Sequence, residues 1–256
     1  MLDALAQLRA RYLDLVRESL VGLVHEDPGL AFRREGGQVP FDRRARLTGR
    51  DWPATALSMI GARRMLQLQQ AVEGVIARGV PGDLIETGVW RGGACILMRA
   101  VLAAHGVTER RVWVADSFSG LPAPDPSRYP ADANAVFHEF EQLAVPLETV
   151  RSHFARYRLL DDQVVFLKGW FRDTLKGAPI ERLAVLRLDG DLYESTMDAL
   201  TALYDKVAPG GIVIVDDFGA IPACAAAVND FRRQRRIADP MQWIDASGVY
   251  WQRAAA

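Results

Sequence analysis

Two short segments of this chain each end in a pair of acidic residues. They are Arg187-Leu-Asp189-Gly-Asp191 and Val215-Asp216-Asp217, and each ends an apolar run typical of a buried strand. The carboxyl ends of parallel strands meet at one edge of a sheet, so we expect the four carboxylates to lie together, where they suit a hard cation such as Mg²⁺ or Mn²⁺. Without a cation they would repel one another and raise one another's pKa. Alternatively, they are solvated loop acids or helix caps.

A glycine-rich turn follows another apolar run, in Asp83-Leu-Ile-Glu86-Thr-Gly88-Val-Trp-Arg-Gly92-Gly93. Such a turn lets the backbone approach a ligand, and the following helix N-terminus offers free N–H groups. The spacing is neither that of a P-loop nor the GxGxxG of dinucleotide sites. Glu86 would repel a pyrophosphate but could bind a cationic group, so S-adenosylmethionine fits. The alternative is an ordinary strand–helix turn whose glycines only permit tight packing.

Two further positions could hold an adenosine. Asp116 ends the run Val112-Trp-Val-Ala-Asp116, where an acid accepts hydrogen bonds from a ribose diol, although it could equally cap a helix. Trp170 and Phe171 follow the apolar run at 164–167, where a ring could cover adenine or belong to the core. A hydrolase triad is poorly supported because no serine lies in a GxSxG setting.

These residues must be positioned by alternating strands and helices. Apolar runs predict strands at 84–87, 112–116, 164–167, 183–189 and 211–216, and helical patterns lie at 92–105, 147–157, 194–207 and 221–236. This alternation predicts a parallel sheet covered on both faces. Runs at 241–244 and 249–251 are only four residues apart, so they must form an antiparallel hairpin. We predict an α/β, Rossmann-like, doubly wound and mostly parallel seven-stranded sheet with a C-terminal antiparallel hairpin, the layout of class I methyltransferases.

The first 80 residues differ from the rest. Leu2, Leu5, Leu8, Tyr12, Leu15, Val16, Leu20 and Leu23 recur at helical spacing. A long connection rich in glycine, proline and arginine follows at 26–51, and a second helix is predicted to begin after Asp51, with Pro53 in its first turn, and to run to about Arg78. We therefore expect an N-terminal helical extension with a substrate-shaping loop at 1–80, and a methyltransferase core at 81–256. Within the core, residues 119–146 are expected to form an active-site flap.

Composition restricts the class of protein. Of the 256 residues 50% are hydrophobic and 25% charged, which argues against a disordered or coiled-coil chain. The net charge of −1 gives no global attraction to nucleic acid or membrane. No apolar run approaches the roughly 18–20 residues of a membrane span, no signal peptide is evident, and the two cysteines lack CxxC spacing. We expect a soluble cytoplasmic protein that binds neither nucleic acid nor membrane.

The same segments resemble the TylF/MycF family of methyltransferases. The resemblance rests on DLIETGVWRGG (83–93), WVADSF (113–118), RLDGD (187–191) and IVDD (214–217), and it extends through 58–61, 159–162, 170–171 and 248–251. It implies an S-adenosylmethionine-dependent and divalent-metal-dependent O-methyltransferase. The implied acceptor is a (deoxy)sugar hydroxyl on a glycosylated natural product, in antibiotic biosynthesis. It also implies a homo-oligomer, a dimer or larger. The 26–50 loop is where we expect the largest departure from relatives.

The resemblance also implies roles for individual residues. The implied metal ligands are Asp189, Asp216 and Asp217, and the implied general base is Asp191, whose role Asp189 could share or exchange. The implied cofactor contacts are Ser58, Met59, Ile60, Glu86, Thr87, Gly88, Arg91, Gly92, Asp116, Ser117, Phe118, Gly169, Trp170, Phe171 and Asp189.

Two alternatives stay open. The first is a metal-dependent O-methyltransferase acting on a catechol or other phenol. Sites of that kind usually bring a lysine near the metal, and the three lysines of this chain all lie outside Asp189–Ser195. The second is a non-catalytic binding protein that retains the fold. A nicotinamide dehydrogenase is disfavoured by the glycine spacing and by the absence of a Tyr-xxx-Lys motif.

Overall fold

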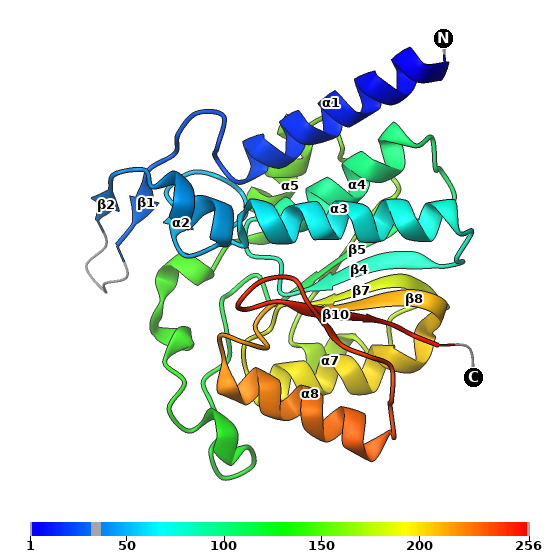
Figure 1. The fold of residues 1–256 in the computed structure, drawn as a ribbon. Coiled ribbons are helices and arrows are strands. Elements are labelled where there is room, and N and C mark those ends of the chain that lie inside the picture. Colours follow the sequence, from blue (N-terminus) through cyan, green and yellow to red (C-terminus); the bar gives the residue numbers. More distant parts are fainter. Residues whose placement is uncertain (1, 32–36, 255–256) are drawn as a thin grey trace.

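The computed structural model describes residues 2–31 and 37–254 (Figure 1). Its main sheet has seven strands in the order β6-β5-β4-β7-β8-β10-β9; β10 pairs antiparallel with β8 and with β9, and the other pairs are parallel. These strands are β4 (Asp83–Thr87), β5 (Val112–Asp116), β6 (Val164–Lys168), β7 (Leu183–Leu188), β8 (Val207–Val215), β9 (Gln242–Trp243) and β10 (Val249–Gln252). The predicted seven-stranded sheet and its C-terminal antiparallel hairpin are confirmed.

Helices cover both faces of the sheet, as the doubly apolar strands require (Figure 1). One face carries α3 (Gly61–Ala77), α4 (Gly93–Ala104) and α5 (Leu147–Arg156), with α1 (Leu2–Leu20) packed outside α3 and α4. The other face carries α6 (Phe171–Thr174), α7 (Tyr193–Leu203) and α8 (Pro222–Gln234). Successive strand residues alternate between the two cores; Leu84, for example, belongs to the first and Ile85 to the second.

The flap (residues 119–146) crosses the carboxyl ends of the strands without a long helix or strand of its own. It contains three single-turn helices: η1 (Pro130–Asp132), η2 (Phe137–Glu139) and η3 (Glu141–Leu143). A fourth short helix, η4 (Tyr204–Lys206), connects α7 to β8.

The expected helix start at Pro53 was wrong. Trp52–Pro53 forms the short strand β3, which pairs with β1 (Gly29–Leu30), and the helix begins only at Gly61. A helix that began at Pro53 would direct the N–H groups of Leu57 and Ser58 to carbonyls four residues back, but both donate to the carbonyl of Leu20, at 2.9 and 3.0 Å. The expected long loop also contains β2 (Gln38–Val39), which pairs with β1, and α2 (Arg43–Thr48).

A buried arginine organises this N-terminal connection. The Arg46 side chain is 0% exposed; it donates to the carbonyls of Val21 and Asp27, each at 2.8 Å, and forms an ion pair with Asp51 at 2.7 Å. Burying a guanidinium is unfavourable unless its donors are satisfied, and here carbonyls and a carboxylate satisfy them. Arg46 therefore holds the path that leads to residues 58–60.

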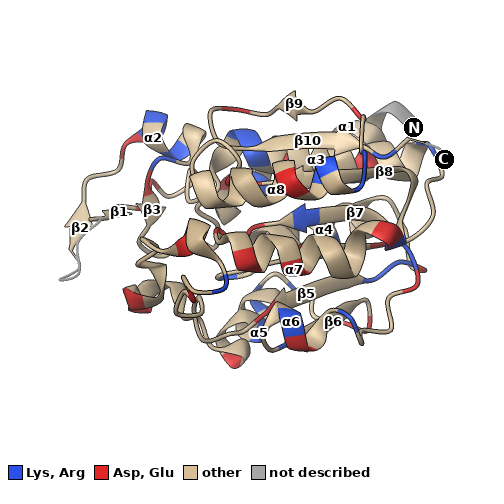
Figure 2. Cartoon of the chain, turned by 90° about the horizontal axis from the view of Figure 1, so that it is seen from below, with Lys and Arg blue, Asp and Glu red and all other residues tan. Residues whose placement is uncertain are grey.

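No helix among the described residues has the length and apolar character needed to cross a bilayer. Basic and acidic positions are interspersed over the helices of the face seen in Figure 2.

We expect Arg46→Met to lower the free energy of unfolding by about 3–5 kcal/mol, because it leaves buried carbonyls and Asp51 without their cation. Denaturant unfolding followed by circular dichroism measures this change. Arg43→Met is the matched control, since Arg43 lies exposed on the same helix. Equal losses of unfolding free energy in the two variants would contradict the stabilising role of the buried Arg46 side chain.

Candidate active site

A cavity of about 590 Å³ lies at the carboxyl ends of the central strands. Chain order reverses between β4 and β7, and such a switch point leaves a crevice beyond the strand ends. The cavity is lined by residues from the ends of β4, β5, β7 and β8, from the 48–64 segment, from the start of α7, from the turn before β10 and from the flap. Its size is typical of a small-molecule site.

Gly88 brings the ends of β4 and β7 into direct contact. Its φ is +89°, and a Cβ built on it would lie 1.8 Å from the carbonyl oxygen of Asp189. The Asp189 N–H in turn donates to the carbonyl of Thr87 at 2.9 Å. Only glycine fits this position, so the glycine-rich turn and the Asp189 turn form two adjoining walls of the cavity.

A buried guanidinium joins three strand ends. Arg187 is 1% exposed and forms ion pairs with Glu86 of β4, with Asp216 after β8, and with Asp189 at 2.6 Å. A second arginine, Arg64 of α3, also forms an ion pair with Asp216, and its Nε lies 3.2 Å from Asp245. Both oxygens of Asp216 are therefore paired with arginines.

Burial and repulsion by neighbouring carboxylates raise the pKa values of Glu86, Asp191, Asp216 and Asp217. Burial raises the pKa of Glu86 to about 7, although Arg187 opposes the rise. Burial, together with the charges of Asp189 and Asp216, raises the pKa of Asp191 to about 7. Burial, with the charges of Asp191, Asp189 and Asp216, raises the pKa of Asp217 well above its usual range. A carboxylate with a pKa near neutrality suits a general base at physiological pH.

Three carboxylates can hold a metal ion together. Asp189, Asp216 and Asp217 each offer one oxygen, and the three oxygens lie within 4.8 Å of one another. Oδ2 of Asp217 is buried and has no hydrogen-bond partner among the described residues. A buried carboxylate oxygen without a donor is best satisfied by a cation, and an all-oxygen set suits Mg²⁺ or Mn²⁺. These residues therefore fit a divalent metal site.

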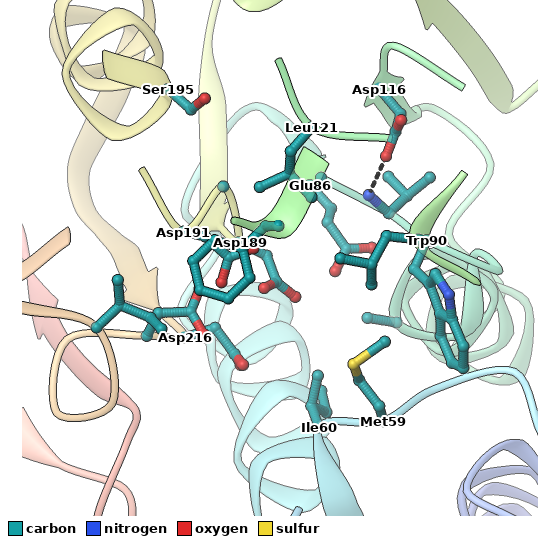
Figure 3. Close-up of a pocket in the computed structure, with 18 of the residues that line it drawn as sticks. Met59, Ile60, Glu86, Trp90, Asp116, Leu121, Asp189, Asp191, Ser195 and Asp216 are labelled. Carbon is teal, nitrogen blue, oxygen red and sulfur yellow. Dashed lines mark hydrogen bonds between the residues drawn. The ribbon is translucent and has the colours of Figure 1, made fainter. Parts of the chain in front are cut away.

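Asp191 faces the same cluster. Figure 3 shows Asp189, Asp191 and Asp216 close together, and the charges of Asp189 and Asp216 act on Asp191. Asp191 has φ +57°, in the left-handed region that an L-residue other than glycine rarely adopts. Trp90 after β4 and Phe118 after β5 share this conformation, with φ of +47° and +56°. Backbone strain of this kind concentrates at functional sites.

Asp116 fastens the glycine-rich turn to β5. Its two carboxylate oxygens accept hydrogen bonds from the N–H groups of Val89 and Phe118, each at 2.7 Å (Figure 3 draws the first). Next to it, Ser117 Oγ donates to the carbonyl of Gly120 at 2.6 Å, where the flap begins. This corner of the cavity lies apart from the acidic cluster (Figure 3).

Comparison with known proteins identifies the family. The family model described as macrocin-O-methyltransferase (TylF) matches residues 9–253. The chain belongs to this family. A relative from Streptomyces olivaceus, named 8-demethyl-8-(2,3-dimethoxy-alpha-L-rhamnosyl)-tetracenomycin-C 4'-O-methyltransferase, is 55% identical over 97% of this chain and 94% of its own. Demethyldecarbamoylnovobiocin O-methyltransferase from Streptomyces niveus is 54% identical over 94% of this chain and 93% of its own.

A solved structure agrees with this assignment. The structure of the O-methyltransferase NovP is 53% identical, with a TM-score of 0.92, and covers 96% of this chain and 100% of its own. This TylF-family protein is thus an S-adenosylmethionine-dependent O-methyltransferase with the class I methyltransferase fold.

Most of the expected site residues of this TylF-family enzyme line the one cavity. They are Ser58, Met59, Ile60, Glu86, Gly88, Asp116, Ser117, Gly169, Trp170, Phe171, Asp189, Asp191, Asp216 and Asp217. The other four expected cofactor contacts, Thr87, Arg91, Gly92 and Phe118, do not line it.

Each of these four residues is turned toward another part of the fold. Thr87 Oγ1 donates to the carbonyl of Arg187 at 3.4 Å, Arg91 donates to the carbonyls of Pro53 and Ala56, and Phe118 packs against Phe166. Gly92 faces the side chain of Val150. These contacts lie behind the cavity wall, so the four residues support the turn rather than line the cavity.

Sequence reasoning missed the two arginines of the acidic cluster, although each leaves a signal. Arg187 interrupts the apolar strand Leu183–Leu188, and a charge there requires a buried partner. Arg64 occupies the apolar stripe of α3, four residues before Leu68. The flap residues Leu121, Phe137 and Leu143 also line the cavity, without any pattern that predicts it.

We expect Gly88→Ala to lower the free energy of unfolding by about 1–3 kcal/mol more than Gly106→Ala does, because the new methyl overlaps backbone. It should also weaken S-adenosylhomocysteine binding at least tenfold in calorimetric titrations. Gly106 also has positive φ, at +66°, but a Cβ built on it would meet no heavy atom within 4 Å, so its variant reports backbone strain alone. Equal effects in the two variants would show that overlap with the Asp189 carbonyl does not add to the backbone strain of the substitution.

Proposed function

We propose that this enzyme transfers a methyl group from S-adenosylmethionine to a hydroxyl of a deoxysugar on a glycosylated natural product, as a tailoring step in antibiotic biosynthesis. The observation that carries the proposal is the cluster Asp189, Asp191, Asp216 and Asp217 in the same cavity as the glycine-rich turn. The name of the Streptomyces olivaceus relative includes a rhamnosyl group and a 4'-O-methylation, which supports a sugar acceptor. None of the described residues around the cavity is a lysine, which favours a weakly acidic alcohol over a phenol.

The chemistry requires an oxygen nucleophile aligned with an activated methyl group. A sugar hydroxyl is a very weak acid, so a base must accept its proton as the new C–O bond forms. Asp191 is the base in this proposal, because it faces the cavity and its pKa is about 7. A divalent ion held by Asp189, Asp216 and Asp217 would act as a Lewis acid toward the hydroxyl oxygen.

Other residues bind the donor and exclude water. In this proposal Glu86 and residues 58–60 hold the methionine end of the cofactor, and Asp116 accepts hydrogen bonds from the ribose hydroxyls. Ser117, Gly169, Trp170 and Phe171 surround the adenine. The flap side chains of Leu121, Phe137 and Leu143 form an apolar cover over the cavity. Removing water from the site strengthens the electrostatic interactions within it.

We also propose that the protein is a homo-oligomer in the cytoplasm. Leu5, Leu8, Tyr12 and Leu15 form an exposed apolar stripe along α1, with Leu8 63% exposed. Such stripes are typical of protein–protein contacts. In this proposal residues 1–80 are an extension of the methyltransferase core at 81–256, and the extension supplies the apolar stripe for the contact.

The acceptor is tested by incubating purified enzyme with methyl-labelled S-adenosylmethionine, Mg²⁺ and a panel of rhamnosylated and other deoxysugar glycosides. Matched aglycones and catechols are included. Label in the sugar of a glycoside is the expected result. Label in catechols alone would replace the proposal with the phenol alternative, and cofactor binding without any transfer would favour a binding protein.

We expect Asp217→Asn to lower turnover by roughly two orders of magnitude or more, because a Lewis acid contributes several kcal/mol to stabilising the developing oxyanion. S-adenosylhomocysteine affinity should stay within threefold, and wild-type activity should disappear with EDTA and return with Mg²⁺ or Mn²⁺. Asp205→Asn is the control, because Asp205 is exposed, lies outside the cavity and pairs its carboxylate with Arg235. Full, EDTA-insensitive activity in Asp217→Asn would rule out the metal mechanism.

A further inference from the structure

The flap contains one side chain whose burial is unexpected. Between residues 119 and 144, all of which the structure describes, Asp132 is the only buried residue, and it is 1% exposed. Its neighbours Ala131, Ala133 and Asn134 are all exposed. A carboxylate is costly to bury without partners, so its contacts show what this part of the flap does.

Asp132 caps a helix that lies some 60 residues away in the chain. Its Oδ1 accepts a hydrogen bond from the N–H of Tyr193 at 2.7 Å, and its Oδ2 accepts one from the N–H of Glu194 at 3.0 Å. These N–H groups open α7, whose own N-cap residue, Leu192, has no side chain that could accept them. The helix dipole further favours a negative charge at this end.

The capped turn is the one that carries the proposed base. Asp191 lies two residues before Tyr193 in a strained left-handed conformation, and Leu192 N–H donates to the carbonyl of Gly190 at 2.6 Å. Such a turn keeps its shape only when its surroundings hold both of its ends. The β7 end is held by the Arg187–Asp189 ion pair, and the α7 end is held by Asp132.

The flap is also attached at its far end to the cofactor turn. The indole N–H of Trp90 donates to the carbonyl of Gln142 at 2.8 Å, and Phe140 packs edge-on against Trp52, with ring centroids 5.8 Å apart. The Tyr129 and Tyr193 rings make a further contact at the α7 end, with centroids 6.0 Å apart. One segment therefore connects the donor side of the cavity to the turn that holds Asp191.

We propose that Asp132 is a positioning residue for methyl transfer: as the remote cap of α7, it places Asp191 against the acceptor hydroxyl when the flap covers the cavity. Asp132 does not line the cavity, so in this proposal it acts through the turn at 189–192. The kinetic part of this inference rests on the proposed function, whereas the structural coupling does not.

Three variants test the inference. Asp132→Ala removes both acceptors, Asp132→Asn keeps one acceptor oxygen, and Glu141→Ala removes an exposed flap acid as the matched control. We expect kcat to fall at least tenfold in Asp132→Ala, by a smaller factor in Asp132→Asn, and by less than twofold in Glu141→Ala. The acceptor KM and the calorimetric Kd for S-adenosylhomocysteine should stay within threefold, with kcat normalised to the cofactor-binding fraction.

Hydrogen–deuterium exchange on the enzyme bound to S-adenosylhomocysteine gives a readout that needs no acceptor. Amides in residues 191–194 should exchange faster in Asp132→Ala than in the wild type and the Glu141→Ala control. Unchanged exchange there, or an unchanged kcat with a raised acceptor KM, would overturn the positioning role. If the wild type methylates no glycoside of the panel, the proposed function fails, while exchange at 191–194 still decides the coupling.

Discussion

The Arg187 guanidinium imposes the constraint on which the active site depends. It is almost completely buried, and a buried cation is tolerated only where carboxylates satisfy it. Its partners Glu86, Asp189 and Asp216 come from the ends of three adjacent strands, so pairing the charge draws β4, β7 and β8 together at their carboxyl ends. Gly88 permits the closest approach, because any side chain there would overlap the carbonyl of Asp189.

The cluster nevertheless contains more acid than Arg187 and Arg64 can neutralise. Asp191 and Asp217 have no arginine of their own, and Oδ2 of Asp217 has no donor among the described residues. Burial and repulsion therefore raise their pKa values, and the fold gains by taking up a proton or a cation here. Perturbed carboxylates of this kind are typical of functional sites, and they agree with the proposed metal ligands and base.

Segments far apart in the chain enclose this centre through bonds from side chains to backbone. Asp27 and Arg46 direct the 48–60 segment to one wall, and Trp90 and Asp132 attach the flap to two others. None of these four contacts is a backbone hydrogen bond between strands of the main sheet. The cavity is therefore covered by chain that the sheet does not itself hold in place.

The sequence by itself determined the sheet, its hairpin and the residues at the strand ends. Apolar runs and glycine turns are local patterns, and parallel strands necessarily bring their carboxyl ends to one edge. Only the tertiary structure decided that Arg187 and Arg64 pair with those acids, that α3 begins at Gly61 rather than near Pro53, and that Thr87, Arg91, Gly92 and Phe118 support the turn from behind. It also decided that Asp132 caps α7. These outcomes depend on which buried donor pairs with which acceptor across separations of 29 to 152 residues, and the local spacing of apolar residues does not specify such pairs.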